Sequence, residues 1–213
     1  MIDLKNMSNK KKAEYIWDYY KLHIIGVLAI ILIVASLIHS QITKIDYVFN
    51  LTMIGNTIDE NKRVNFEKQL TSFVIKPGDK KKQAIVDIIP ADSSNSVESI
   101  MSNQYMQKFV VRISVGDLDV VILDKKLFES LVKQDTFLKL ENISQLNLAT
   151  IKNEKIEASG SDNKKAVYAI NAVDIKMFNK MGFDTHNKVI GIISSCKQKE
   201  KAASVLKWLL RGA

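Results

Sequence analysis

Aspartates around one apolar segment are the residues whose spacing could do chemistry. Asp117 and Asp124 flank the largely apolar run 118–123, Asp119 lies near its start, and Asp92 follows Pro90 in a break of the chain. Divalent cations take carboxylate oxygens as ligands, and open α/β sheets hold ligands at the carboxyl ends of parallel strands. A cation site is therefore one interpretation. Acids that merely end a buried strand are the other, which we favour, so no metal ion is predicted.

A small ligand is the second chemistry that the same strand ends could support. Polar and glycine residues follow each of the first three predicted strands, where loops would meet at one edge of a parallel sheet. These candidate ligand loops comprise Gly55, Asn56, Asp92, Ser93, Ser94 and Asp124.

Catalytic arrangements are not apparent. His23 and His39 lie in or at the edge of a long apolar segment, which leaves His186 as the one histidine beyond it, so a histidine metal site and a serine-histidine triad both lack support. There is no phosphate loop and no Gly-x-Gly-x-x-Gly motif. Cys196, the single cysteine, cannot form an internal disulfide and is expected to be a buried structural thiol. We expect neither an enzyme nor a cofactor.

The apolar segment is the most informative feature of the chain. Residues 22–43 carry no formally charged side chain, and their length matches the roughly 20 residues that span the hydrocarbon core of a bilayer. A cleaved signal peptide would have a shorter apolar stretch followed by small residues at a cleavage site. The sequence therefore predicts a cytoplasmic tail at 1–21, a transmembrane helix at 22–43 and an extracytoplasmic domain at 44–213.

Lysine placement predicts the orientation, because cytoplasmic flanks carry an excess of basic residues. Five lysines precede the apolar segment, whereas few follow it closely, so the N-terminus is expected in the cytoplasm of a cell with a single-pass protein in its membrane. Aromatic rings and a lysine at the start of the segment are predicted to anchor it at headgroup depth: Trp17, Tyr19, Tyr20 and Lys21.

The elements beyond Lys44 predict an α/β domain with a mostly parallel sheet covered on both faces. The chain has 213 residues, of which 46% are hydrophobic and 25% charged, and this composition fits a folded domain. Strands are predicted at 45–54, 83–89, 118–123, 166–170 and 188–193. Helices are predicted from a cap at Thr57 or Asp59 to before Lys76, from Val97 through Ile113, and at 126–133, 174–181 and 198–210. Residues 140–165 are polar and weakly patterned, with a turn at 159–163.

Two stretches of the domain resemble a known family. The segment GDLDVVILDKKLFESLVKQDTFLKLENI, residues 116–143, looks like the central part of type 2 extracellular solute-binding proteins, and VIGIISSCKQKEKAASVLKWLL, residues 189–210, looks like their closing strand, loop and helix. The domain is too short for both lobes of such a protein, so the resemblance implies one truncated lobe. The phrase YIWDYYKLHIIGVL, residues 15–28, also looks like the start of anchored extracytoplasmic proteins of Gram-positive bacteria, so such a source and a membrane anchor are expected. Because the family holds its ligand between two lobes, no binding residues are carried over.

Two functions follow from these features. The favoured one is a non-catalytic docking module, an accessory subunit of a membrane transport or export complex such as an ABC transporter. The alternative is a protein that captures a small ligand or metal ion with the strand-end loops. The predicted partners are the lipid bilayer and another membrane protein, and no nucleic acid.

Overall fold

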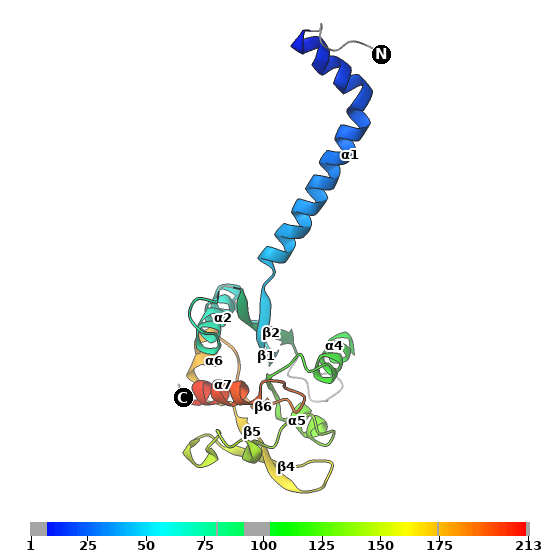
Figure 1. Ribbon diagram of the computed structural model, residues 1–213. Coiled ribbons are helices and arrows are strands. Elements are labelled where there is room, and N and C mark those ends of the chain that lie inside the picture. Colours follow the sequence, from blue (N-terminus) through cyan, green and yellow to red (C-terminus); the bar gives the residue numbers. More distant parts are fainter. Residues whose placement is uncertain (1–7, 80, 92–102, 174, 212–213) are drawn as a thin grey trace. The chain divides into compact units, whose positions relative to one another are not determined.

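A single long helix makes up most of the described part of the first unit of the chain. In the computed structural model, helix α1 runs from Asn9 to Thr43 (Figure 1). Its segment Trp17–Thr43, 27 residues, is long and apolar enough to cross a membrane, and none of its side chains is buried. At about 1.5 Å per residue it exceeds the roughly 30 Å of a bilayer core. An N-terminal apolar helix, compatible with a membrane anchor or a signal sequence, is thus confirmed.

The structure describes residues 8–79, 81–91, 103–173 and 175–211. Contacts divide the chain into two units, Met1–Ile45 and Asp46–Ala213. The second unit is an α/β domain built on one sheet of six strands in the order β2-β1-β3-β6-β5-β4. These strands are β1 (Asp46–Gly55), β2 (Lys82–Pro90), β3 (Val120–Asp124), β4 (Lys155–Ser159), β5 (Lys165–Asn171) and β6 (Lys188–Ile192).

The sheet is mixed, so the expectation of a mostly parallel sheet was wrong. Strands β2, β1 and β3 are parallel, but β6 is antiparallel to β3, and β5 and β4 continue antiparallel. The reason lies in the connections. The turn 160–164 between β4 and β5 is too short for a parallel crossover, which needs about a dozen residues, so these two strands pair antiparallel. Helix α6 (Lys176–Met181) lies in the connection from β5 to β6.

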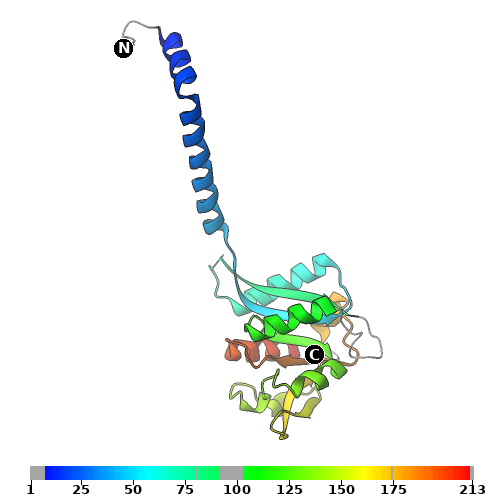
Figure 2. The ribbon, with the colours of Figure 1, turned by 90° about the vertical axis from the view of Figure 1, so that its right-hand side faces the viewer.

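Helices cover both faces of the sheet and enclose two apolar cores (Figure 2). Helices α2 (Glu60–Val74), α6 and α7 (Lys199–Arg211) lie on one face, together with the short helices η2 (Leu140–Asn142) and η3 (Leu148–Thr150). Helices α4 (Asn103–Ser114) and α5 (Lys125–Val132) lie on the other face. Strand β1 serves both cores, because Phe49, Leu51 and Met53 alternate with residues that point to the opposite side.

Local signals fix the helix ends close to their predicted positions. The Asp59 carboxylate accepts a hydrogen bond from the backbone N–H of Lys62, which confirms Asp59 as the N-cap of α2. Gly116 adopts φ +67° just after α4, a conformation that favours glycine, and a Cβ there would lie 2.9 Å from the Ser195 carbonyl oxygen. The predicted start of that helix at Val97 lies outside the described residues.

Side chains of α2 cover part of the exposed edge of β2. The Val86 N–H donates to the Glu67 carboxylate at 2.9 Å, and Arg63 donates to the Val86 carbonyl at 3.0 Å. One turn further along α2, the Thr71 hydroxyl accepts from the Ala84 N–H at 3.1 Å. These bonds satisfy edge groups that would otherwise be free to pair with another strand.

Candidate functional site

The predicted ligand loops meet, in part, at the carboxyl end of β1 and β3. The Asn56 side chain donates to the Gly182 carbonyl at 2.9 Å and accepts from the Asp184 N–H at 2.8 Å. The Asp124 carboxylate pairs with the Lys188 ammonium at 2.9 Å. Polar groups of two predicted site residues are therefore used to hold the loop before β6.

Side chains of the domain fill the space beside Gly55. Lys188 is only 5% exposed, and its ammonium lies 5.9 Å from the centre of the Phe183 ring. A Cβ placed on Gly55 would lie 2.9 Å from the Lys188 side chain and 3.0 Å from that of Phe183. This close approach favours glycine at position 55 and accounts for it without a ligand. Asp92, Ser93 and Ser94 lie outside the described residues, so a ligand site that includes them stays a prediction.

The aspartates around β3 are not one cluster. Asp117 and Asp119 lie before the amino end of the strand and Asp124 at its carboxyl end. Asp117 pairs with Arg112 at 3.0 Å. Within the described ranges, no group of three or more His, Cys, Asp or Glu residues is placed to hold a metal ion.

Asp119 and Cys196 form a buried polar pair. The Asp119 carboxylate accepts from the Asn50 N–H at 2.8 Å and from the Cys196 thiol at 3.0 Å. Burial raises the pKa of the Asp119 carboxyl, and burial together with this bond raises the pKa of the Cys196 thiol to about 12. The predicted burial of the Cys196 thiol is confirmed.

Replacement of Asp119 by asparagine is expected to change how stability depends on pH. A carboxyl whose pKa is higher in the folded than in the unfolded state loses stabilisation as pH rises from the unfolded value through the folded one. The asparagine amide does not ionise in this range. The free energy of unfolding of the Asp119→Asn variant should therefore rise relative to that of the wild type as the pH rises from 4 to 7. Urea unfolding of both proteins at each pH measures this, and an equal difference at both pH values would contradict it.

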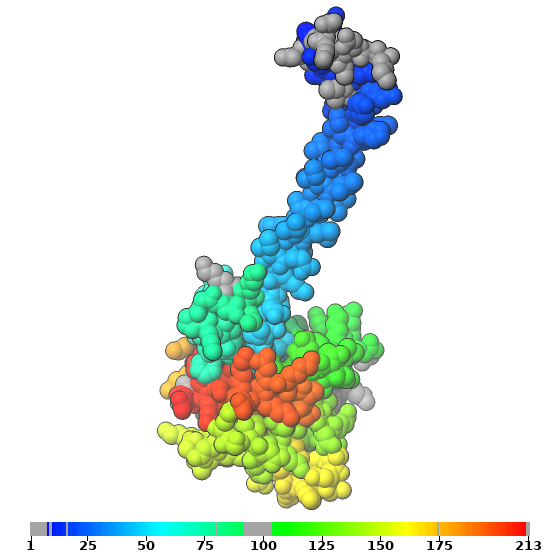
Figure 3. Space-filling view, viewed as in Figure 1, coloured from blue at the N-terminus to red at the C-terminus, as the bar shows by residue number. Residues whose placement is uncertain are grey.

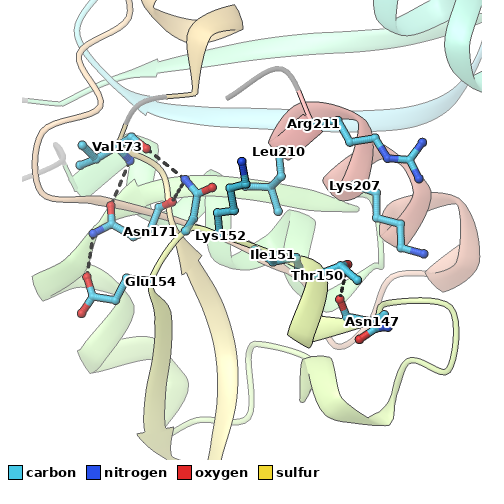
Figure 4. Close-up of a pocket in the computed structure, with 11 residues that line it drawn as sticks. Asn147, Thr150, Ile151, Lys152, Glu154, Asn171, Val173, Lys207, Leu210 and Arg211 are labelled. Atoms are coloured by element: carbon cyan, nitrogen blue, oxygen red, sulfur yellow. Dashed lines mark hydrogen bonds between the residues drawn. The ribbon is translucent and has the colours of Figure 1, made fainter.

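A pocket of about 790 Å³ opens elsewhere, at the end of α7 (Figure 4). It is bounded by the segment around η3, by the end of β5 and by the last turns of α7. The residues that line it are Asn147, Thr150, Ile151, Lys152, Asn153, Glu154, Asn171, Val173, Lys207, Leu210 and Arg211. Its size falls within the range of about 300–1,000 Å³ that small-molecule sites occupy.

Hydrogen bonds hold one wall of this pocket. The Asn153 amide donates to the carbonyls of Asn171 and Val173, at 3.2 and 3.1 Å. The Asn171 amide donates to the Glu154 carboxylate at 2.9 Å and its oxygen accepts from the Val173 N–H at 2.9 Å. The loop before β4 is thereby tied to the end of β5, so the wall is formed before any ligand arrives.

Positive charge gathers at the other end of the pocket. Figure 4 shows Lys207 and Arg211 side by side on α7, Lys152 between them and the asparagine wall, and Glu154 at the far side. Among the residues that the structure describes, no ion pair includes any of these three cations. The buried side chain of Leu210 lies beside them. A concave site with cations and an apolar surface is suited to binding a ligand.

An apolar surface on α4 is a second unpredicted feature. Val111 and Val115 are 60% and 59% exposed, and Tyr105 and Val110 are also exposed. β-branched residues are poor choices for a solvated helix face. Val111 and Val115, which follows the end of α4, are four residues apart and lie on one side of the helix, and neighbouring exposed apolar side chains mark surfaces that contact proteins or membranes.

The predicted membrane-anchor residues lie on α1, before and at the start of its apolar part. Trp17, Tyr19, Tyr20 and Lys21 are all exposed. The rings of Tyr19 and Tyr20 contact each other edge to face, with centroids 5.1 Å apart. Such exposed aromatic side chains are compatible with a position at a membrane interface.

Comparisons with known proteins give one weak likeness. No protein-family model matches the sequence, and neither does any curated protein. A solved structure named extracellular solute-binding protein family 1, from Alicyclobacillus acidocaldarius subsp. acidocaldarius DSM 446, is 17% identical with a TM-score of 0.33. The match covers 60% of this chain and only 28% of that chain. At this TM-score, the resemblance to solute-binding proteins stays a prediction.

Proposed function

We propose that this chain is a single-pass membrane protein whose α/β domain is a non-catalytic binding module outside the cell. α1 is the anchor, the lysine-rich tail lies in the cytoplasm, and the pocket at the end of α7 takes a small extracellular ligand. The observation that carries the proposal is this pocket, because it combines a volume of about 790 Å³ with a wall held by hydrogen bonds. Ligand sites are typically concave and largely formed in advance.

The test is native mass spectrometry of the full-length protein purified from membranes in mild detergent. We expect a small molecule to accompany the wild type and to be lost from Val173→Trp, since the indole would occupy the pocket beside Asn171. Val111→Trp is the matched control, because it adds the same ring to an exposed valine on α4, away from the pocket. A ligand kept equally by both variants, or found with neither them nor the wild type, would contradict the assigned site.

A second function is favoured by the exposed apolar face of α4. Here the domain docks on another membrane protein, as an accessory subunit of a transport or export complex. A membrane anchor confines both proteins to one surface, and this raises their effective concentration so that weak lateral contacts suffice. The face of Val111 and Val115 is the proposed contact.

Affinity purification from native membranes distinguishes docking from ligand capture. If docking is correct, a membrane protein should co-purify in stoichiometric amount with the wild type and with Val173→Trp, but not with Val111→Asp. The charge would be buried in the apolar contact without a partner. Purification of the wild type alone would contradict docking and leave the pocket as the proposed site.

A further inference from the structure

We infer that the pocket at the end of α7 selects an organic anion, a molecule with a carboxylate or phosphate group on a carbon body. This inference rests on the proposed function, because it names the ligand class for the same pocket. The inference is based on the cations on one side of the pocket and on the apolar surface next to them.

The cations converge because of where the chain places them. Lys207 and Arg211 are four residues apart on α7, so their side chains share one face of the helix. Lys152 comes from the segment before β4, and Figure 4 shows it directed into the space between that segment and α7. The guanidinium of Arg211 offers a planar fork that matches the two oxygens of a carboxylate or phosphate.

The opposing charges of the described residues are smaller or lie on the far side of the pocket. The C-terminal end of a helix carries about −0.5 of a charge, which disfavours an anion near the end of α7. Lys207 and Arg211 contribute two full positive charges there. Among the described residues, Glu154 is the one acid in the lining, and Figure 4 shows it at the far side of the pocket from Lys207 and Arg211. The net effect at the α7 end is attraction for an anion.

The apolar lining indicates what the charged group is attached to. Ile151 and Leu210 are 8% and 9% exposed and line the same pocket as the cations. Their residual surface is suited to contact with carbon atoms of a ligand. A ligand with an anionic head and a carbon body satisfies both parts of the lining.

Lysine labelling of the full-length protein in detergent tests the inference, with inorganic phosphate as the probe. Acetylation rates of individual lysines are measured by mass spectrometry with phosphate and with sodium chloride of equal ionic strength. We expect phosphate to slow labelling of Lys152 and Lys207 selectively. Lys199 is the matched control, since it is exposed on the same helix but does not line the pocket. In Arg211→Ala, the phosphate concentration for half-protection should rise about tenfold to a hundredfold.

The outcomes distinguish the anion inference from the proposed function as a binding module. Protection that chloride reproduces, that extends equally to Lys199, or that is absent would overturn the anion inference. If protection is absent but a neutral molecule accompanies the wild type and is lost from Val173→Trp, the ligand class is wrong and the binding module stands. If neither protection nor any bound molecule is found, both statements fail.

Discussion

Replacement of Lys188 by alanine is expected to lower the free energy of unfolding of the domain by about 3 kcal/mol. Lys188 is nearly buried, and its ion pair with Asp124 joins the start of β6 to the end of β3, the two central strands of the sheet. Loss of the ammonium leaves the Asp124 carboxylate, which is 19% exposed, without this partner. It also removes the methylenes packed beside Gly55 and Phe183.

Urea unfolding of the full-length protein, followed by the fluorescence of Trp208 in a Trp17→Phe background, measures this change. Trp208 reports on the domain, because it stacks on Phe66 and Phe73. Lys125→Ala is the matched control, since Lys125 is exposed beside Asp124, and it should change stability by less than about 0.5 kcal/mol. Equal stabilities of the two variants would contradict a structural role for the buried pair.

Two arginines in the middle of α1, Leu32→Arg with Val34→Arg, are expected to release the protein from the membrane. Arginine near the centre of a transmembrane helix costs about 2.5–3.5 kcal/mol on insertion scales, so two cost about 5–7 kcal/mol. Both side chains are exposed on α1 within the apolar segment. Membrane fractions washed with alkaline carbonate should retain the wild type and lose the double variant.

Leu32→Ala with Val34→Ala is the control, because it shortens the same side chains without adding charge. Intact mass distinguishes an anchor from a signal sequence, since an anchor keeps all 213 residues and a cleaved signal would leave a shorter chain. Retention of the arginine variant in washed membranes would show that α1 is not what holds the protein there.

Apolar patterns in the sequence located most elements but not the direction of the strands. The run 118–123 predicted a strand buried on both faces, and β3 has that environment at Val120 to Leu123. A buried run has the same composition in a parallel or an antiparallel strand. Direction depends on the connections, as the short turn 160–164 shows for β4 and β5. Strand β4 was missed because it is a short edge strand in which only Ile156 is buried.

The pocket was invisible in the sequence for a different reason. Lys152, Asn171 and Lys207 are far apart along the chain, and the pairing of β5 with β4 and the packing of α7 bring them together. The one local signal was the four-residue spacing of Lys207 and Arg211 on a helix. In the folded domain these parts of the chain are neighbours: Figure 3 shows α7, in orange to red, at the surface beside the segment 140–150.

The position of β6 in the sheet has a consequence for the newly made chain. Strand β3 is paired on one side with β1, but its other neighbour, β6, follows it by about 70 residues. At translation rates of about 5–20 residues per second, β6 emerges roughly 3 to 14 seconds after β3. During this interval the centre of the sheet presents an open strand edge to other nascent chains. A chain that ends before residue 188 would therefore keep an unpaired edge on β3, and we expect such a fragment to aggregate rather than to form a smaller stable domain.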